Sequence, residues 1–476
     1  MAGFHSLAGK SHDERDDPTT DDPNGEGSEN LKADGGGGED ERVEIHNVVF
    51  ALCCDSLECL PNQTPMSNAQ RWAIVCLLSL GMVIAYIDRA NISVALALPE
   101  FKKAFQLTDS QRGALNSAFF WSYAFLQIPA GYLVDRYGVK WPYAISFVFW
   151  SIFSAMTAFT TTIGQIVVLR VLLGIGEAIV TPASMRWIRF NIPESQRGLA
   201  VGIYMAGTKY GPGIGLPAAA FLSRDYGWQN MFLILSMGCM VWLIPWIFMV
   251  RNDDRALEQM AAAKVTGATL PFADVFKTPL IYGVIVGTFC YNYFVFFSMT
   301  WLPAYLIEQR GMTAKQMGVI SFASFAGMGT VAILAGLVAD RMIARGANAV
   351  KVRKGFTIGG LAVASTELIG AMSSDTNIAM IFAVISLAGL GLATANYWAL
   401  TQTLIPGGAL SGRIAGVQNF ASNFSGIVAP LLTGWLKQTT GTYEAPMAFI
   451  FFLLLLGIAS YVFLVREKYV PQVVAA

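Results

Sequence analysis

The run YIDRAN at residues 86–91 places Asp88 and Arg89 inside a segment, about residues 72–98, that is otherwise apolar enough to span a bilayer. A carboxylate or a guanidinium in hydrocarbon costs several kcal/mol unless it is partnered and faces the protein interior or a wet cavity. Neighbouring residues on a helix point about 100° apart, so these two side chains cannot readily serve only each other. The run therefore predicts a functional pair, with a purely structural buried ion pair as the alternative.

A second set of charges, Arg170 and Glu177, lies seven residues apart in LRVLLGIGEA at 169–178. Seven residues are two helical turns, so we expect both side chains on one face and in one cavity with Asp88 and Arg89. A carboxylic acid holds its proton more tightly in an apolar surrounding and less tightly beside a guanidinium. A carboxylate whose arginine partner comes and goes can thus couple transport to protons. Arg170 is then also a candidate for binding the substrate. The alternative is that Arg170 and Glu177 pair only to hold helices together.

Lys209, in MAGTKYGPG at 205–213, is a further cation at membrane depth. Its position is too central for the ammonium group to reach the membrane surface. It predicts a second anchor for a carboxylate, and hence a diacid or an anion of another size. We assign no role to Glu367.

The candidate binding groups of the second half are neutral. Amide and indole groups suit the hydroxyl groups of a sugar acid, as do two tyrosines of the first half, and interhelical hydrogen bonding is an equally good explanation. These candidates are Trp398, Asn419, Asn423, Tyr86 and Tyr123.

The elements that must position these groups are membrane helices. The chain is 54% hydrophobic and only 13% charged, far from the roughly 25% charged content of soluble domains. Twelve stretches are long enough to span, and they are centred near residues 84, 123, 150, 174, 210, 239, 288, 326, 363, 389, 422 and 454. We predict an all-α protein made of an acidic disordered tail (1–66), a six-helix bundle (67–250), a cytoplasmic linker (251–277), a second six-helix bundle (278–466) and a short tail (467–476).

The distribution of charge orients the protein and excludes several functions. Fifteen basic residues fall on the side of the loops that carries both termini and seven on the other, which predicts cytoplasmic termini. The three histidines and three of the six cysteines lie before Met66, so we expect no metal site in the membrane part of the chain. Met66 itself could be the true translation start. No P-loop is present to bind ATP.

The two halves also repeat one motif at the end of their second helix. GYLVDRYG at 131–138 and GLVADRMI at 336–343 share the pattern GxxxDR, which is the trace of a transporter built from two bundles. We expect these residues to gate the bundles, with charge pairs that hold them together in one state. The gating residues are Gly131, Asp135, Arg136, Gly336, Asp340 and Arg341.

From about Met66 the sequence resembles the major facilitator superfamily, and within it the anion:cation symporters. This group includes permeases for hexuronate, galactonate, glucarate and phthalate, and the sialic acid exporter sialin. The resemblance rests on YIDRAN, GYLVDRYG, LRVLLGIGEA and PESQRG at 193–198. It implies that Asp88 and Glu177 couple protons and that Arg89 contacts the substrate's carboxylate. Relatives carry a neutral amide aligned with Thr208, which is therefore a binding candidate, and Lys209 departs from them and argues against a simple galactonate assignment.

Together these observations predict a secondary transporter of the cell inner (plasma) membrane that moves an organic anion with protons by alternating access. The expected substrate is a sugar acid: a hexuronate, an aldonate or an aldarate. Alternatives are an exchanger or facilitator for another carboxylate, such as an aromatic acid, and a transporter-like membrane receptor for anions. We expect no enzyme activity, no cofactor besides the coupling proton and no nucleic acid partner, and we expect a monomer in the lipid bilayer.

Overall fold

The computed structural model describes residues 66–251, 276–404 and 408–470, and within these ranges the protein is almost entirely helical, with no strand. All twelve predicted centres fall on helices, so the prediction of an all-α membrane protein is confirmed. In the described residues nine helical segments are long and apolar enough to cross a membrane. One of them, residues 196–249, covers two of the predicted spans, and two more polar helices, α4 (Asp109–Tyr137) and α18 (Gly408–Thr440), are consistent with the full set of twelve.

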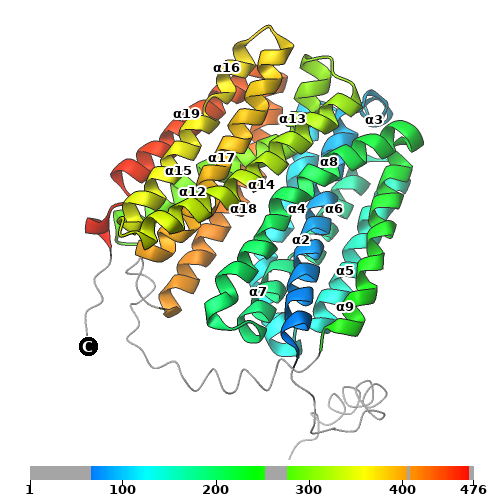
Figure 1. Ribbon diagram of the computed structural model, residues 1–476. Helices are drawn as coiled ribbons and strands as arrows, with labels where there is room; N and C mark the ends of the chain where they lie inside the picture. The colour runs from blue at the N-terminus through cyan, green and yellow to red at the C-terminus, as the bar shows by residue number, and fades with distance from the viewer. Residues whose placement is uncertain (1–65, 252–275, 405–407, 471–476) are drawn as a thin grey trace, which may run out of the picture. The chain divides into compact units, whose positions relative to one another are not determined.

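The helices form two groups that follow each other in the sequence and in the colours of Figure 1. The first group contains α2 (Asn68–Ala97), α3 (Pro99–Phe105), α4, α5 (Lys140–Met156), α6 (Ile163–Glu177), α7 (Val180–Asn191), α8 (Glu194–Cys239) and α9 (Leu243–Met249). The second group contains α12 (Pro279–Thr300), α13 (Leu302–Ala304), the π-helical turn η3 (Tyr305–Gln309), α14 (Ala314–Ala344), α15 (Ala349–Ala364), α16 (Glu367–Met372), α17 (Thr376–Leu404), α18 and α19 (Glu444–Phe463).

Several helices begin at the same local signal in the sequence. A serine or threonine accepts a hydrogen bond from the backbone N–H of a glutamine three residues on, and the side chain of that glutamine reaches back to the cap. Such a capping box satisfies two backbone N–H groups at once and is worth about 1 kcal/mol per cap. It sets the starts of four helices: α2 at Ser67, α4 at Thr108, α6 at Thr162 and α14 at Thr313.

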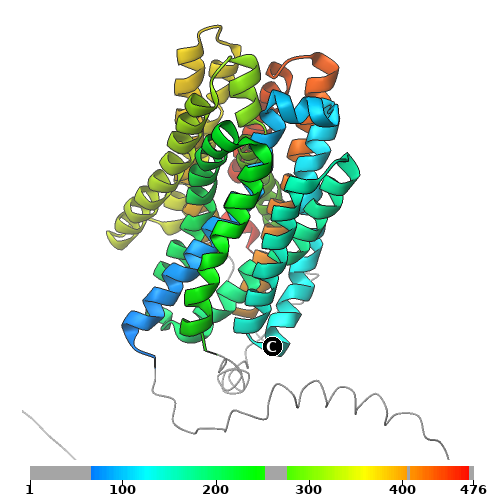
Figure 2. The same ribbon diagram turned by 90° about the vertical axis from the view of Figure 1, so that its right-hand side faces the viewer.

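Helix α8 packs closely on α2, and the contact can be followed in Figures 1 and 2. Gly207, Gly211 and Gly215, one turn apart, face α2, and a Cβ at Gly211 would collide with the Cβ of Tyr86. Gly227, at φ 83°, interrupts the helix between its two spans in the left-handed conformation that glycine adopts without strain. This packing fixes the α8 side chains relative to YIDRAN.

The two groups contact each other mainly through α4 with α18 and α8 with α14. The predicted tail up to residue 65 and most of the predicted linker at 251–277 lie outside the described residues. The predicted C-terminal tail at 467–476 begins with a 3-10 turn, Glu467–Tyr469, and its part after residue 470 lies outside the described residues.

Candidate functional site

A central cavity of about 2520 Å³ lies between the two groups of helices. Its lining runs from Tyr86 and Asn292, half-way along α2 and α12, to Arg197 at the start of α8 and Gln402 near the end of α17. Those last residues mark the end of the bundle at which α8 begins, and we call this end the mouth. The cavity therefore reaches one end of the bundle.

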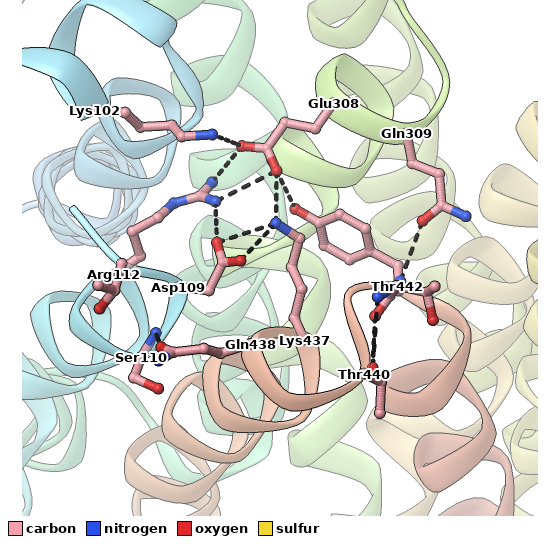
Figure 3. Close-up of polar contacts among 12 residues, drawn as sticks. Lys102, Asp109, Ser110, Arg112, Glu308, Gln309, Lys437, Gln438, Thr440 and Thr442 are labelled. Carbon is pink, nitrogen blue, oxygen red and sulfur yellow. Dashed lines mark hydrogen bonds and ion pairs between the residues drawn. The ribbon is translucent and has the colours of Figure 1, made fainter. Parts of the chain in front are cut away.

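The opposite end is held shut by charges from both groups, drawn in Figure 3. Glu308, in η3, accepts from Lys102 (3.0 Å), Arg112 (2.9 Å) and Lys437 (2.9 Å), and Asp109 accepts from Arg112 (2.7 Å) and Lys437 (3.0 Å). We call these five residues the closed-end network. Because Lys102, Asp109 and Arg112 belong to the first group and Glu308 and Lys437 to the second, the network ties the two groups together.

Glu308 lies beyond the α12 span, and its side chain is 17% exposed. Burial raises the pKa of its carboxyl, but the charges of Arg112 and Lys437 outweigh burial and lower the pKa to about 2. A depressed pKa gives stability that is present above the unfolded value near 4.5 and is lost as pH falls toward 2. Glu308 is therefore ionised throughout the range from about pH 5 to 8, and its own titration cannot give transport a pH dependence there.

We expect Glu308→Gln to open the closed end. The change leaves three cations facing one carboxylate, and removing one partner of a buried pair costs about 3 kcal/mol. Spin labels on the exposed residues Lys103 and Thr439, on opposite groups, should report a longer distance in the variant by pulsed electron resonance. Glu100→Gln, an exposed glutamate at the same end, is the matched control. An unchanged distance distribution would show that the network does not hold this end.

Arg89 and Glu177 form a buried ion pair, with Arg89 Nε 2.6 Å from Glu177 Oε2. The guanidinium also lies 4.5 Å from the ring centroid of Tyr86 and 4.3 Å from that of Tyr123. Arg89 Nη2 and Glu177 Oε1 are buried without hydrogen-bond partners in the described residues. Neither residue lines the cavity, whereas both tyrosines do, so the pair sits behind an aromatic wall of the cavity.

Asp88 and Arg170 occupy a second polar layer behind that wall. Ser154 Oγ donates to Asp88 Oδ1 at 2.8 Å, and Asp88 Oδ2 has no hydrogen-bond partner within the described ranges. Arg170 donates to the backbone carbonyl oxygen of Asp88 at 3.3 Å and to Asn91 Oδ1 at 3.2 Å. Thus Arg170 does not pair with Glu177, and Asp88 does not pair with Arg89. None of the four charged side chains lines the cavity, although we expected all four to share it.

The other predicted binding residues do line the cavity: Tyr86, Tyr123, Thr208, Lys209, Trp398, Asn419 and Asn423. Asn419 of α18 donates to Gln127 of α4, a contact between the two groups of helices. Asn423 donates to the backbone carbonyl oxygen of Asn419 at 2.9 Å, and Thr208 donates to that of Met205 at 2.8 Å. Gln127 was missed in the sequence, although an amide in the apolar middle of α4 is itself a signal.

The repeated GxxxDR motifs lie at the mouth, and their aspartates pair within their own group. Asp135 pairs with Arg186 of α7, and Asp340 pairs with Arg353 of α15 at 3.0 Å. We expected these residues to hold the two bundles together in one state. In the present conformation the mouth is open and the ties across the groups lie at the closed end, so the expectation stays a prediction for the state in which the mouth is closed. Arg136 lies against the ring of Tyr137, Arg341 is exposed and Gly336 lines the cavity. No atom of the described residues outside its own helical turn lies within 4 Å of a Cβ on Gly131.

Glu367 is buried away from the cavity and accepts a hydrogen bond from Ser386 Oγ at 2.6 Å. Within the described residues no group of histidine, cysteine and acidic side chains is arranged to hold a metal ion.

The chain is similar to known membrane transporters. Residues 78–430 match the Major Facilitator Superfamily. The sequence is 30% identical to a D-galactonate transporter of Escherichia coli over 431 residues, covering 86% of this chain and 98% of the relative. It is 27% identical to a hexuronate transporter of Bacillus subtilis over 422 residues, covering 86% and 97%.

Among solved structures, a bacterial homologue of the human lysosomal transporter Spinster, captured inward-facing and unoccupied, has a TM-score of 0.70 at 16% identity and covers 84% of this chain and 98% of that one. This likeness concerns the fold. From the family match and the curated relatives, the protein is a multi-pass membrane transporter and not an enzyme, and the chain belongs to the major facilitator superfamily and, within it, to the anion:cation symporter family.

Proposed function

We propose that the protein carries a sugar acid together with protons across the cell inner membrane. The family and the acids named for its relatives support the anion, and the buried pair of Arg89 with Glu177 supports the coupling. We place both termini, and hence the mouth of the cavity, in the cytoplasm, because the basic residues gather on that side. The transporter acts as a monomer with the proton as its coupling ion.

The observation that carries the proposal is the ion pair of Glu177 with Arg89. The guanidinium still has an N–H group, at Nη2, that no described residue accepts a hydrogen bond from. A guanidinium binds a carboxylate best with two parallel hydrogen bonds from one edge. While Glu177 is ionised, it competes with the substrate's carboxylate for Arg89. Once Glu177 is protonated, its interaction with the guanidinium is weaker. Binding of the substrate's carboxylate is thereby linked to binding of a proton.

The aromatic rings define how the substrate reaches this pair. Tyr86 and Tyr123 separate Arg89 from the cavity. A modest rotation of these rings uncovers the free edge of the guanidinium, and their hydroxyl groups then serve the hydroxyl groups of the acid. Asn419 and Asn423 face the same space from the second group and bind the remaining hydroxyl groups.

Asp88 supplies a second proton site in the layer behind. Its Oδ2 is buried without a partner among the described residues, and Ser154 donates to its Oδ1. A buried carboxylate oxygen without a donor is costly when charged, so a proton on that oxygen relieves the cost. We assign to Asp88 the same role that the family resemblance implies.

Reconstituted protein in liposomes tests the proposal. An inward proton gradient should drive accumulation of radiolabelled galactonate or glucuronate above equilibrium, and a protonophore should abolish it. Counterflow of the same acids without any effect of the gradient would instead make the protein an exchanger. Movement of neutral sugars but of no acid would overturn the anion assignment.

A further inference from the structure

Lys209 is the cation of the central cavity whose charged group has neither a hydrogen-bond acceptor nor an acidic partner in the part of the protein that the structure describes. Four charged side chains line the cavity among the described residues: Arg197, Lys209, Asp340 and Arg353. Asp340 and Arg353 pair with each other, and Arg197 donates to the backbone carbonyl oxygen of Ile192. For Lys209 the described residues provide only the ring of Tyr291, whose centroid lies 5.7 Å from Nζ.

The direction of Lys209 follows from the packing of α8. Gly207 and Gly211 face α2, and residue 209 lies about 200° around the helix from each of them, so its side chain points away from α2. It points toward α14, where a Cβ on Gly329 would lie 3.3 Å from the Cβ of Lys209. The ammonium group continues to Tyr291 on α12, in the second group of helices.

The surroundings of the ammonium group are those of a binding site rather than of a structural ion pair. Tyr291 is fixed by a 2.7 Å hydrogen bond to Thr394 and by its ring contact with Tyr397, 4.6 Å between centroids. A cation–π contact alone is a weak substitute for the solvation that a lysine loses in a cavity. The partner that suits this ammonium group is an anion, and an anion that enters the cavity reaches Lys209 before Arg89, because Arg89 lies behind Tyr86 and Tyr123.

We propose that Lys209 makes this transporter selective for dianions, so that one acid group of the substrate binds Arg89 and a second binds Lys209 beside Tyr291. The inference rests on the proposed function, because it takes the Arg89 site as given. Arg89 lies behind the aromatic wall of the first group of helices, and Lys209 reaches Tyr291 in the wall formed by the second group. The substrate class is therefore an extended diacid, such as an aldarate, rather than a monoacid.

The test compares two acids that differ at one carbon. D-Galactonate ends in CH2OH where galactarate carries a second carboxylate. Isothermal titration of the full-length purified protein should show galactarate bound at least about 10-fold more tightly than galactonate, the range expected for one added charge-assisted hydrogen bond. Lys209→Gln should weaken galactarate about 10- to 100-fold and bring the ratio of the two affinities near one. Lys209→Arg should restore part of the preference.

Lys315→Gln, an exposed lysine at the start of α14, is the matched control and should keep the preference for galactarate. Equal affinities in the unmodified protein would overturn the inference, as would a Lys209→Gln protein that loses both acids by the same factor. The affinities of the unmodified protein for galactarate and galactonate test the selectivity for dianions even if the Lys209→Gln variant does not fold. Proton-driven uptake of galactonate without a preference for galactarate would refute the selectivity for dianions alone. If neither acid is bound or taken up, the proposed function is refuted as well.

Discussion

The Glu177→Gln protein is expected to lose proton-driven accumulation of its acid, by at least about 100-fold, while it keeps exchange of labelled for unlabelled substrate. Glutamine is close in size to a protonated glutamate, so Arg89 is permanently released to the substrate, as in the loaded state. A carrier fixed in its protonated form moves loaded in both directions but cannot return empty. Initial rates of net uptake and of counterflow in the same liposomes measure the two steps separately.

Glu367→Gln is the matched control, because Glu367 is an equally buried glutamate that accepts one hydrogen bond in the second group of helices. We expect its coupling to be normal. If the Glu177→Gln protein accumulates its acid against a gradient as the unmodified protein does, Glu177 does not carry the coupling proton. If it binds no acid at all, Glu177 is a ligand of the substrate.

Loss of Arg89 is expected to remove binding of the acid. Arg89→Gln eliminates the guanidinium that lies against Tyr86 and Tyr123, and it leaves Glu177 without its only ionic partner in the described residues. A buried charge left unpaired costs about 3–5 kcal/mol, so this variant is also expected to be less stable. Titration calorimetry measures the binding, and thermal denaturation measures the stability.

The double variant Arg89→Gln with Glu177→Gln separates the two effects. Both members of the pair are neutral in it, so we expect it to recover stability relative to Arg89→Gln alone and still to bind no acid. A double-mutant cycle of the four proteins gives the coupling free energy of the pair. Unchanged affinity for the acid in either variant would move the anchor of the substrate from Arg89 to Lys209 or Arg170.

The sequence predicted the charges of the site well because the membrane makes them conspicuous. Asp88, Arg89, Arg170 and Glu177 stand out in apolar spans, and their spacing assigned them to two helices. Their partners could not be deduced, because Arg89 and Glu177 are 88 residues apart and the choice between Glu177 and Asp88 depends on how α2 is rotated against α6. Helix spacing also placed Arg170 and Glu177 on one face. It could not show that aromatic side chains of other turns and helices separate that face from the cavity.

The closed-end network could not be predicted from the sequence, because its charges are not conspicuous where they occur. Lys102, Arg112 and Lys437 lie at the ends of helices, where charge is ordinary and serves to orient a membrane protein. Glu308 lies in a π-helical turn that follows a short helix, and neither element has a clear pattern in the sequence. The sequence predicted instead that the GxxxDR repeats gate the bundles. In this conformation their aspartates form ion pairs within each group separately.

The composition of the closed-end network has a consequence for the capture of substrate. It contains three cations, Lys102, Arg112 and Lys437, and two carboxylates, Asp109 and Glu308, so its sum is one positive charge. While the groups are joined these charges satisfy one another, but when the groups part they line the rim of the new entrance. A rim of positive sign draws anions inward and speeds their arrival, an effect that added salt weakens. The side chains that seal the empty carrier on one face thus become an electrostatic funnel for its cargo on the same face.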